Sequence, residues 1–181
     1  MAKLLGLLVV VALLASTALY LYGRQQQPLA LGALTAGAEN GGPGASAVVL
    51  DADGLLRFAT IVRNTGRLPV TLEGVAASSG KPELLVVTSI GLGDGSDPTS
   101  AAVFAPVDLD PGSGVGLVVV FGVNAAYPCD RLGTDPAAAL PLPAIAIRFS
   151  SYGVTGTQAL TADDAPVVSG ITRASCKTAA A

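Results

Sequence analysis

Two cysteines are the residues of this 181-residue chain whose chemistry is easiest to specify. Cys129 and Cys176 are its only cysteines, and an even number in an exported chain predicts a disulfide. This bridge would stabilise the fold by roughly 4 kcal/mol, because it closes a long loop. The alternative is two unpaired thiols in a reducing compartment. A metal shell or a redox pair is not expected, because the cysteines lie far apart and the chain has no histidine.

The chain also has no tryptophan, and its one methionine is Met1. Without an imidazole it cannot form a Ser-His-Asp triad or a Cys-His pair. A copper site is excluded with them, because it needs His, Cys and usually Met ligands. The sequence therefore predicts no enzyme, no catalytic residue, no cofactor and no metal ligand.

Four carboxylates beside turns are the candidates for a pair that could hydrolyse a glycosidic bond. They are Asp94, Asp97, Asp108 and Asp110. Aspartate is common in turns for backbone reasons, and no tryptophan is present to stack on a sugar. We interpret all four as turn residues.

Calcium is the ligand that best fits the closely spaced oxygens of two segments, Asp51-Ala52-Asp53-Gly54 and Asp94-Gly95-Ser96-Asp97. Neither segment holds the twelve-residue ligand series with its closing Glu, so a simple Asp-Gly turn is the preferred interpretation. The spaced glycines of 91–95 and 112–116 lack the context of phosphate-binding loops, and we interpret them as flexible turns.

Composition limits the classes of protein further. Apolar residues make up 51% of the chain and charged residues 13%, which excludes a disordered or acidic-tail protein. The net charge is −3, so the basic surface that a nucleic-acid partner requires is missing.

The first elements to place are at the N-terminus, where Leu4 to Tyr22 form 19 residues without a formal charge. As a helix this run would span about 28 Å, close to the thickness of a hydrocarbon core. It predicts a transmembrane signal anchor over residues 1–24, with 4–22 in the membrane and the C-terminal part extracytoplasmic. The alternative is a signal peptide cut after Ser16-Thr17-Ala18, which would release a freely secreted domain.

Residues 25–44 are rich in Gly, Ala and Gln and show no sustained period, which predicts a flexible linker. Leu29, Leu31 and Leu34 are apolar enough for part of this segment to pack on the domain. Residues 25–181 hold eight of the ten Lys and Arg and all 13 Asp and Glu, a net charge of −5.

From residue 45 to 181 short apolar runs alternate with turn residues, which predicts an all-β sandwich or barrel. The expected strands are Ser46–Leu50, Leu55–Val62, Leu68–Ala76, Leu84–Ile90, Ala101–Val107, Val115–Val123, Ala144–Tyr152, Val154–Thr161 and Pro166–Cys176. Leu117 to Phe121 is apolar on both faces and is expected to be a central strand. Asn64 and Gly66 are expected to form a tight turn with left-handed backbone.

Two segments of the sequence share their order of strands and turns with a known family. Phe58 to Leu72 has the form strand, Asn-x-Gly turn, strand, and Leu109-Asp110-Pro111-Gly112 precedes the strand from Val115 to Phe121. This combination resembles immunoglobulin-like β-sandwich modules of bacterial envelope proteins. The resemblance implies a Greek-key sandwich of seven to nine strands, and the whole layout resembles single-pass envelope proteins of GC-rich bacteria.

The expected function is that of a non-catalytic, membrane-anchored extracytoplasmic domain. Such a domain would be an interaction or accessory component of an envelope assembly, with a protein partner. The alternatives are a binding module for a small ligand, an ion or the cell wall, and the freely secreted domain.

Overall fold

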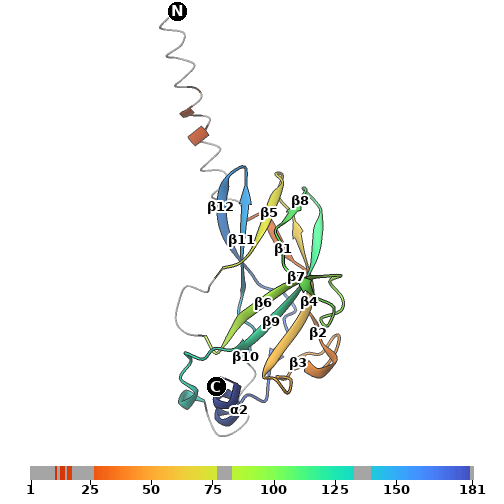
Figure 1. Cartoon of the computed structure of the whole chain (residues 1–181), viewed down its shortest axis with the longest axis vertical. Helices are drawn as coiled ribbons and strands as arrows, with labels where there is room; N and C mark the ends of the chain where they lie inside the picture. The colour runs from red at the N-terminus through yellow and green to blue at the C-terminus, as the bar shows by residue number, and fades with distance from the viewer. Residues whose placement is uncertain are drawn as a thin grey trace, which may run out of the picture.

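The computed structural model describes residues 27–76, 83–132 and 140–179, with Val11, Leu13, Leu14, Ser16 and Thr17. The described part is mostly β-structure, as predicted (Figure 1). Its elements are β1 (Leu29–Leu31), β2 (Thr35–Ala36), η1 (Ala38–Asn40), β3 (Ala47–Val48), β4 (Leu55–Asn64), β5 (Val70–Val75), β6 (Leu85–Gly93), β7 (Ala102–Val103), β8 (Val107–Leu109), β9 (Gly114–Val123), η2 (Cys129–Arg131), β10 (Leu140–Pro141), β11 (Ile145–Ser151), β12 (Val154–Leu160), β13 (Val167–Val168) and α2 (Arg173–Ala179).

Three sheets organise these strands. A six-stranded sheet has the order β1-β4-β9-β6-β7, with β2 also paired to β4, and a four-stranded sheet has the order β12-β11-β5-β8. A three-stranded sheet, β10-β13-β3, contains the parallel pair β3–β13. Figure 1 shows the β11–β12 hairpin at one end of the molecule and α2 at the opposite end.

The core follows from alternation along the long strands. In β4 the residues Leu56, Phe58 and Val62 point inward, and in the four-stranded sheet Ile145 and Ile147 do the same. The faces of both sheets contribute to one hydrophobic cluster. Strand β9 lies between β4 and β6, so the prediction of a central strand is confirmed.

The predicted linker over 25–44 is wrong for most of its length. Strand β1 pairs with β4 from Leu29, and Leu29 is 3% exposed. Leu31 and Leu34 also pack against the core, as their apolar character indicated. The domain therefore begins well before residue 45, because β4 offers an edge and the core offers apolar contacts that these leucines fill.

The predicted strand Pro166–Cys176 is also wrong beyond its first residues. Only Val167–Val168 form a strand, and Cys176 lies in α2. Thr172 and Ser175 explain the change, because the Thr172 hydroxyl accepts the Ser175 backbone N–H (3.2 Å) and the Ser175 hydroxyl accepts the Thr172 backbone N–H (2.9 Å). This reciprocal cap satisfies two donors that a helix start leaves open.

The tight turn predicted at Asn64 and Gly66 forms in a different way. Neither residue has a positive φ. Asn64 ends β4 with its side chain buried, and its Oδ1 accepts the Gly66 N–H (2.9 Å). A Cβ at Gly66 would lie 2.8 Å from the Pro28 Cβ, so this glycine provides space rather than left-handed backbone.

The glycines interpreted as flexible turns are partly strand residues. Gly93 in β6 and Gly116 in β9 are register partners. A Cβ at Gly116 would collide with the backbone of Gly93, Asp94 and Gly95. Gly116 therefore allows the chain leaving β6 to fold back across β9, and this close approach requires a residue without a side chain.

Gln158 joins the two large sheets where their strands cannot pair. Its Nε2 donates to the Leu29 carbonyl (2.6 Å), and its Oε1 accepts the Leu29 N–H (3.0 Å). Gln158 is 8% exposed and Leu29 is 3% exposed. The Gln158 carboxamide therefore makes the two hydrogen bonds that a neighbouring strand would make to the free edge of β1.

The predicted anchor over residues 4–22 lies outside the described residues, apart from five helical positions between Val11 and Thr17. Within the described part of the chain, no helix has the length and apolar character that crossing a bilayer requires.

Replacing Gln158 by methionine is expected to lower the free energy of unfolding by about 3 kcal/mol, because both backbone groups of Leu29 lose their buried partner. Urea denaturation measures this loss. Thr157→Met, at the neighbouring exposed position of β12, is the control and is expected to cost less than about 0.5 kcal/mol. Equal denaturation midpoints for the two variants would contradict the role of Gln158.

Candidate functional site

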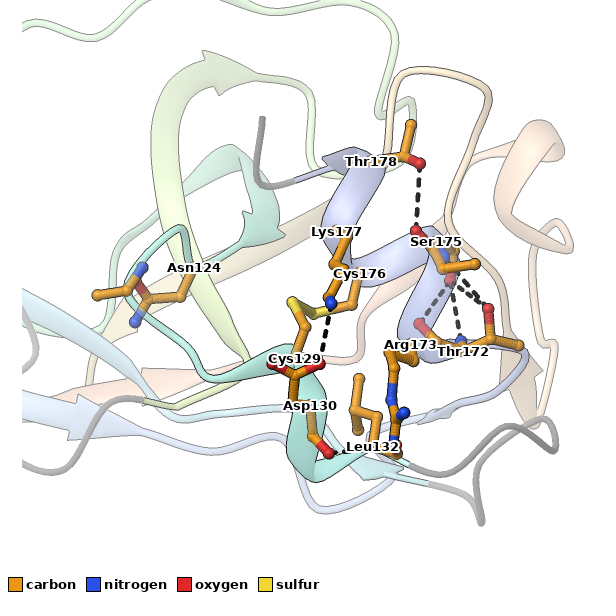
Figure 2. Close-up of a disulfide and its surroundings, with 12 residues drawn as sticks. Asn124, Cys129, Asp130, Leu132, Thr172, Arg173, Ser175, Cys176, Lys177 and Thr178 are labelled. Carbon is orange, nitrogen blue, oxygen red and sulfur yellow. Dashed lines mark hydrogen bonds and ion pairs between the residues drawn. A yellow bond between two sulfur atoms is a disulfide. The ribbon is translucent and has the colours of Figure 1, made fainter.

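The predicted disulfide is present and defines one end of the domain. Cys129 lies in η2, directly after the six-stranded sheet's central strand and its turn, and Cys176 lies in α2 (Figure 2). Their Cα atoms are 5.8 Å apart, and both residues are buried. The bridge thus fixes α2 onto the η2 loop. The sequence predicts a strand at Cys176, and this residue lies in a helix instead.

Polar contacts reinforce the same junction. Lys177 Nζ lies 2.8 Å from Asp130 Oδ1. Arg173 donates to the carbonyls of Leu132 (3.0 Å) and Asp130 (3.2 Å). Figure 2 shows these side chains reaching from α2 toward η2 beside the sulfur atoms. The helix is only seven residues long, so its position depends on these contacts.

A cavity of about 420 Å³ opens next to α2. The Asp51–Gly54 turn, Ser169–Gly170, and Ser175 and Thr178 of α2 line it. The turn and the helix are distant in sequence, and the disulfide at Cys176 holds α2 beside the cavity.

Asp51 and Asp53, weighed from the sequence as calcium ligands and interpreted as turn residues, have protein partners. Asp51 Oδ1 accepts the backbone N–H groups of Asp53 and Leu55, both at 2.9 Å. Asp51 Oδ2 binds the Arg57 guanidinium, which also lies 3.8 Å from Asp53. The carboxylate of Asp51, whose side chain is 1% exposed, is therefore committed to its own turn and to a cation.

Asp94 and Asp97 form a second turn in which carboxylate oxygens again accept nearby backbone N–H groups. Asp94 Oδ1 accepts the N–H groups of Ser96 (2.7 Å) and Asp97 (2.9 Å), and Asp97 Oδ1 accepts the N–H and hydroxyl of Thr99. The Ser96 N–H lowers the pKa of Asp94, and the Thr99 hydroxyl lowers the pKa of Asp97. Lowered values keep both side chains ionised, which suits turn acceptors rather than a general acid.

Asp108 and Asp110, the other two carboxylate candidates, belong to a different part of the fold. Asp108 lies in β8 of the four-stranded sheet and accepts the Thr71 hydroxyl (2.6 Å). Asp110 starts the turn into β9, where its carbonyl accepts both the N–H and the hydroxyl of Ser113. The four candidates are thus divided between two turns and strand β8, and only the Asp108 contact with Thr71 joins neighbouring strands.

Hydroxyl-bearing side chains line part of the cavity beside α2. The hydroxyls of Ser169, Ser175 and Thr178 each donate to a backbone carbonyl, so only their oxygen atoms are left to accept from a ligand. The sequence reasoning missed these residues, because it placed Cys176 and its neighbours in a strand. The signal that would have found the helix is Thr172-Arg173-Ala174-Ser175, a capping pattern followed by Lys177 in the last turn.

No family model matches this chain, and a search of curated proteins finds no match.

Removing the disulfide by the double change Cys129→Ala and Cys176→Ala is expected to lower the free energy of unfolding by about 4 kcal/mol, because the unfolded chain gains the entropy of an open loop. Chemical denaturation measures this loss. Reductant is the matched control, since it should destabilise the wild-type chain and leave the double variant unchanged. A wild-type chain that is insensitive to reductant would contradict the stabilising role.

The Lys177 hydrogen bond, and then its charge, lower the pKa of Asp130, with a smaller contribution from Arg173. The contribution of this pair to stability is expected to be present above the ordinary carboxyl value of about 3.9 and lost as the pH falls through the lowered pKa. Lys177→Gln is expected to raise the pKa of Asp130 toward the ordinary value, and Arg173→Gln is expected to raise it less. Carboxyl NMR titration decides this order, and a reversed order would contradict it.

Proposed function

We propose that this chain is a non-catalytic, membrane-anchored extracytoplasmic domain that acts as an interaction or accessory component of a bacterial envelope assembly. The Cys129–Cys176 bridge is the observation that carries the proposal. Structural disulfides form and persist in oxidising compartments, such as the bacterial periplasm and the cell surface. A bridged β domain behind an uncharged N-terminal run is the arrangement that an exported, anchored protein would have.

The N-terminal residues support the anchor. The uncharged run from Leu4 to Tyr22 is long enough for a hydrocarbon core. Of its described residues, Val11, Leu13 and Leu14 are 54%, 62% and 65% exposed. Large apolar side chains left uncovered by the domain are expected to be covered by another apolar medium, and a lipid bilayer is the simplest one.

Strand order supports an immunoglobulin-like Greek-key sandwich as the finer description of the fold. Such sandwiches have sheet orders A-B-E-D and C-F-G. The orders β1-β4-β9-β6 and β5-β11-β12 have the same form. Strand β8 is added at the free edge of β5, between the chain positions of D and E.

Exposed apolar side chains support the proposal that the domain has a protein partner. Val103, on the edge strand β7, is 92% exposed, and Val49, beside the α2 cavity, is 44% exposed. Edge strands with free backbone groups and exposed apolar residues are common places for a second chain to pair. No reactive group need take part in such an interaction.

The second candidate function is a binding module for a small polar ligand, an ion or a cell-wall fragment. The cavity of about 420 Å³ beside α2 is the observation that favours it. Its hydroxyls and backbone groups suit a carbohydrate or another polyol. Native mass spectrometry of purified protein would reveal such a ligand as a defined mass increment.

Fractionation of a bacterial host tests the anchor and its topology. The full chain is expected in the membrane pellet after alkaline extraction, and protease added outside spheroplasts is expected to digest the β domain. Leu13→Arg is the control and should shift protein out of the pellet, because a charge at the centre of a spanning helix costs about 3 kcal/mol. Recovery of wild-type protein inside the cell would refute the proposal, and a mature chain starting at Leu19 would favour the secreted alternative.

A further inference from the structure

The domain begins close to the proposed anchor. Pro28 is already part of the fold, since its carbonyl accepts the Thr65 N–H (2.7 Å) and the Thr65 hydroxyl (3.1 Å). Five residues separate Pro28 from Tyr22, the last residue of the uncharged run. Fully extended they span about 20 Å, and a flexible chain of this length averages about 13 Å. The lipid headgroup layer takes up about 5–8 Å of that distance.

The entry point of the chain identifies the end of the domain that this short connection holds. Pro28, Gly66 and Arg67 share a small hollow with Ser151, and the Ser151 hydroxyl donates to the Pro69 carbonyl (2.7 Å). Strand β1 therefore starts beside the β4–β5 turn and the tip of the β11–β12 hairpin. Figure 1 shows these tips at the end of the molecule opposite α2.

Tyr152 stands at the tip of that hairpin. It is 77% exposed, and its φ of +48° is the only positive value at a non-glycine residue among those described. The hairpin thus presents a large aromatic side chain outward, and no hydrogen bond or ring contact within the described fold holds it. Tyrosine is enriched at the boundary between lipid and water, where its ring lies among headgroups and its hydroxyl reaches water.

The charge at this end is compatible with a lipid surface. Arg63 and Arg67 are exposed and have no ion pair with a described residue, and they offset Asp108 and Asp110 in the same region. The net charge of −5 on residues 25–181 therefore comes from other parts of the chain. Two free guanidinium groups can meet anionic headgroups without the repulsion that an acidic face would cause.

We propose that the domain stands end-on against its own bilayer, with the β11–β12 hairpin and the β4–β5 turn at the lipid headgroups and Tyr152 inserted among them. This inference rests on the anchor proposed above. The partner is the headgroup layer of the membrane that holds residues 4–22, and α2 with its disulfide then lies on the distant side. Strand β9 alone separates the two ends by about 30 Å.

The absence of tryptophan from the chain provides a direct test. Tyr152→Trp introduces a single fluorescent reporter at the hairpin tip of the full chain. Ala125→Trp introduces the matched reporter at an exposed turn after β9, at the far end. Both variants are reconstituted in phosphatidylcholine vesicles containing phosphatidylglycerol, with or without a nitroxide-labelled headgroup as quencher.

The expected result is a roughly twofold or greater loss of emission for Tyr152→Trp and little loss for Ala125→Trp. Adding Arg67→Glu to the Tyr152→Trp chain is expected to reduce the quenching. Equal quenching of the two reporters, or none for either, would overturn the end-on arrangement while leaving the anchor intact. Flotation of the vesicles reports the anchor separately, and a chain that fails to float with them overturns both proposals.

Discussion

Three buried carboxamide side chains complete the hydrogen bonding that the strands of this domain leave open. Asn40, Asn64 and Gln158 are 1%, 0% and 8% exposed, and each binds backbone groups of other segments. Asn40 donates to the carbonyls of Val49 and Leu55 and accepts the Arg57 N–H. A buried backbone group without a partner is costly, so short and irregular strands can surround a core only where such substitutes exist. Among the described residues, no buried side-chain nitrogen or oxygen lacks a partner.

Two of these side chains lie at the ends of strand β4, which is also paired with β9, β1 and β2. Asn40 holds its beginning against the chain that leads to the Asp51 turn, and Asn64 holds its end. Asn64 Nδ2 donates to the carbonyls of Leu68 and Leu109, which ties the β4–β5 turn to the start of the β8–β9 turn. The α2 cavity and the hairpin end therefore lie at opposite ends of one rigid strand. In the proposed end-on arrangement, the cavity and the disulfide face away from the bilayer.

Many polar side chains of the described residues bind other groups of the fold. Asp51 caps its own turn and binds Arg57, Asp94 and Asp97 cap theirs, and the thiols form a bridge. These groups stabilise the domain and its turns. The exposed groups without such a commitment include Val103 on an edge strand, Tyr152 at a hairpin tip, and Arg63 and Arg67. Such groups can bind another protein or a lipid surface. For this reason the proposed function is binding and not catalysis.

Alternation and turn residues were enough to predict the β class, most strand positions and the central place of β9, because these depend on local periodicity. The even count of two cysteines predicted the bridge. Tertiary structure decided the rest. Leu29 pairs with β4 on one side, and a side chain from the other sheet, 129 positions away, satisfies its free edge. Gly116 is required by a chain segment folding over it, and the packing of α2 against η2 depends on a disulfide to a residue 47 positions away. Contacts between segments distant along the chain leave no period in the sequence, so only the folded arrangement reveals them.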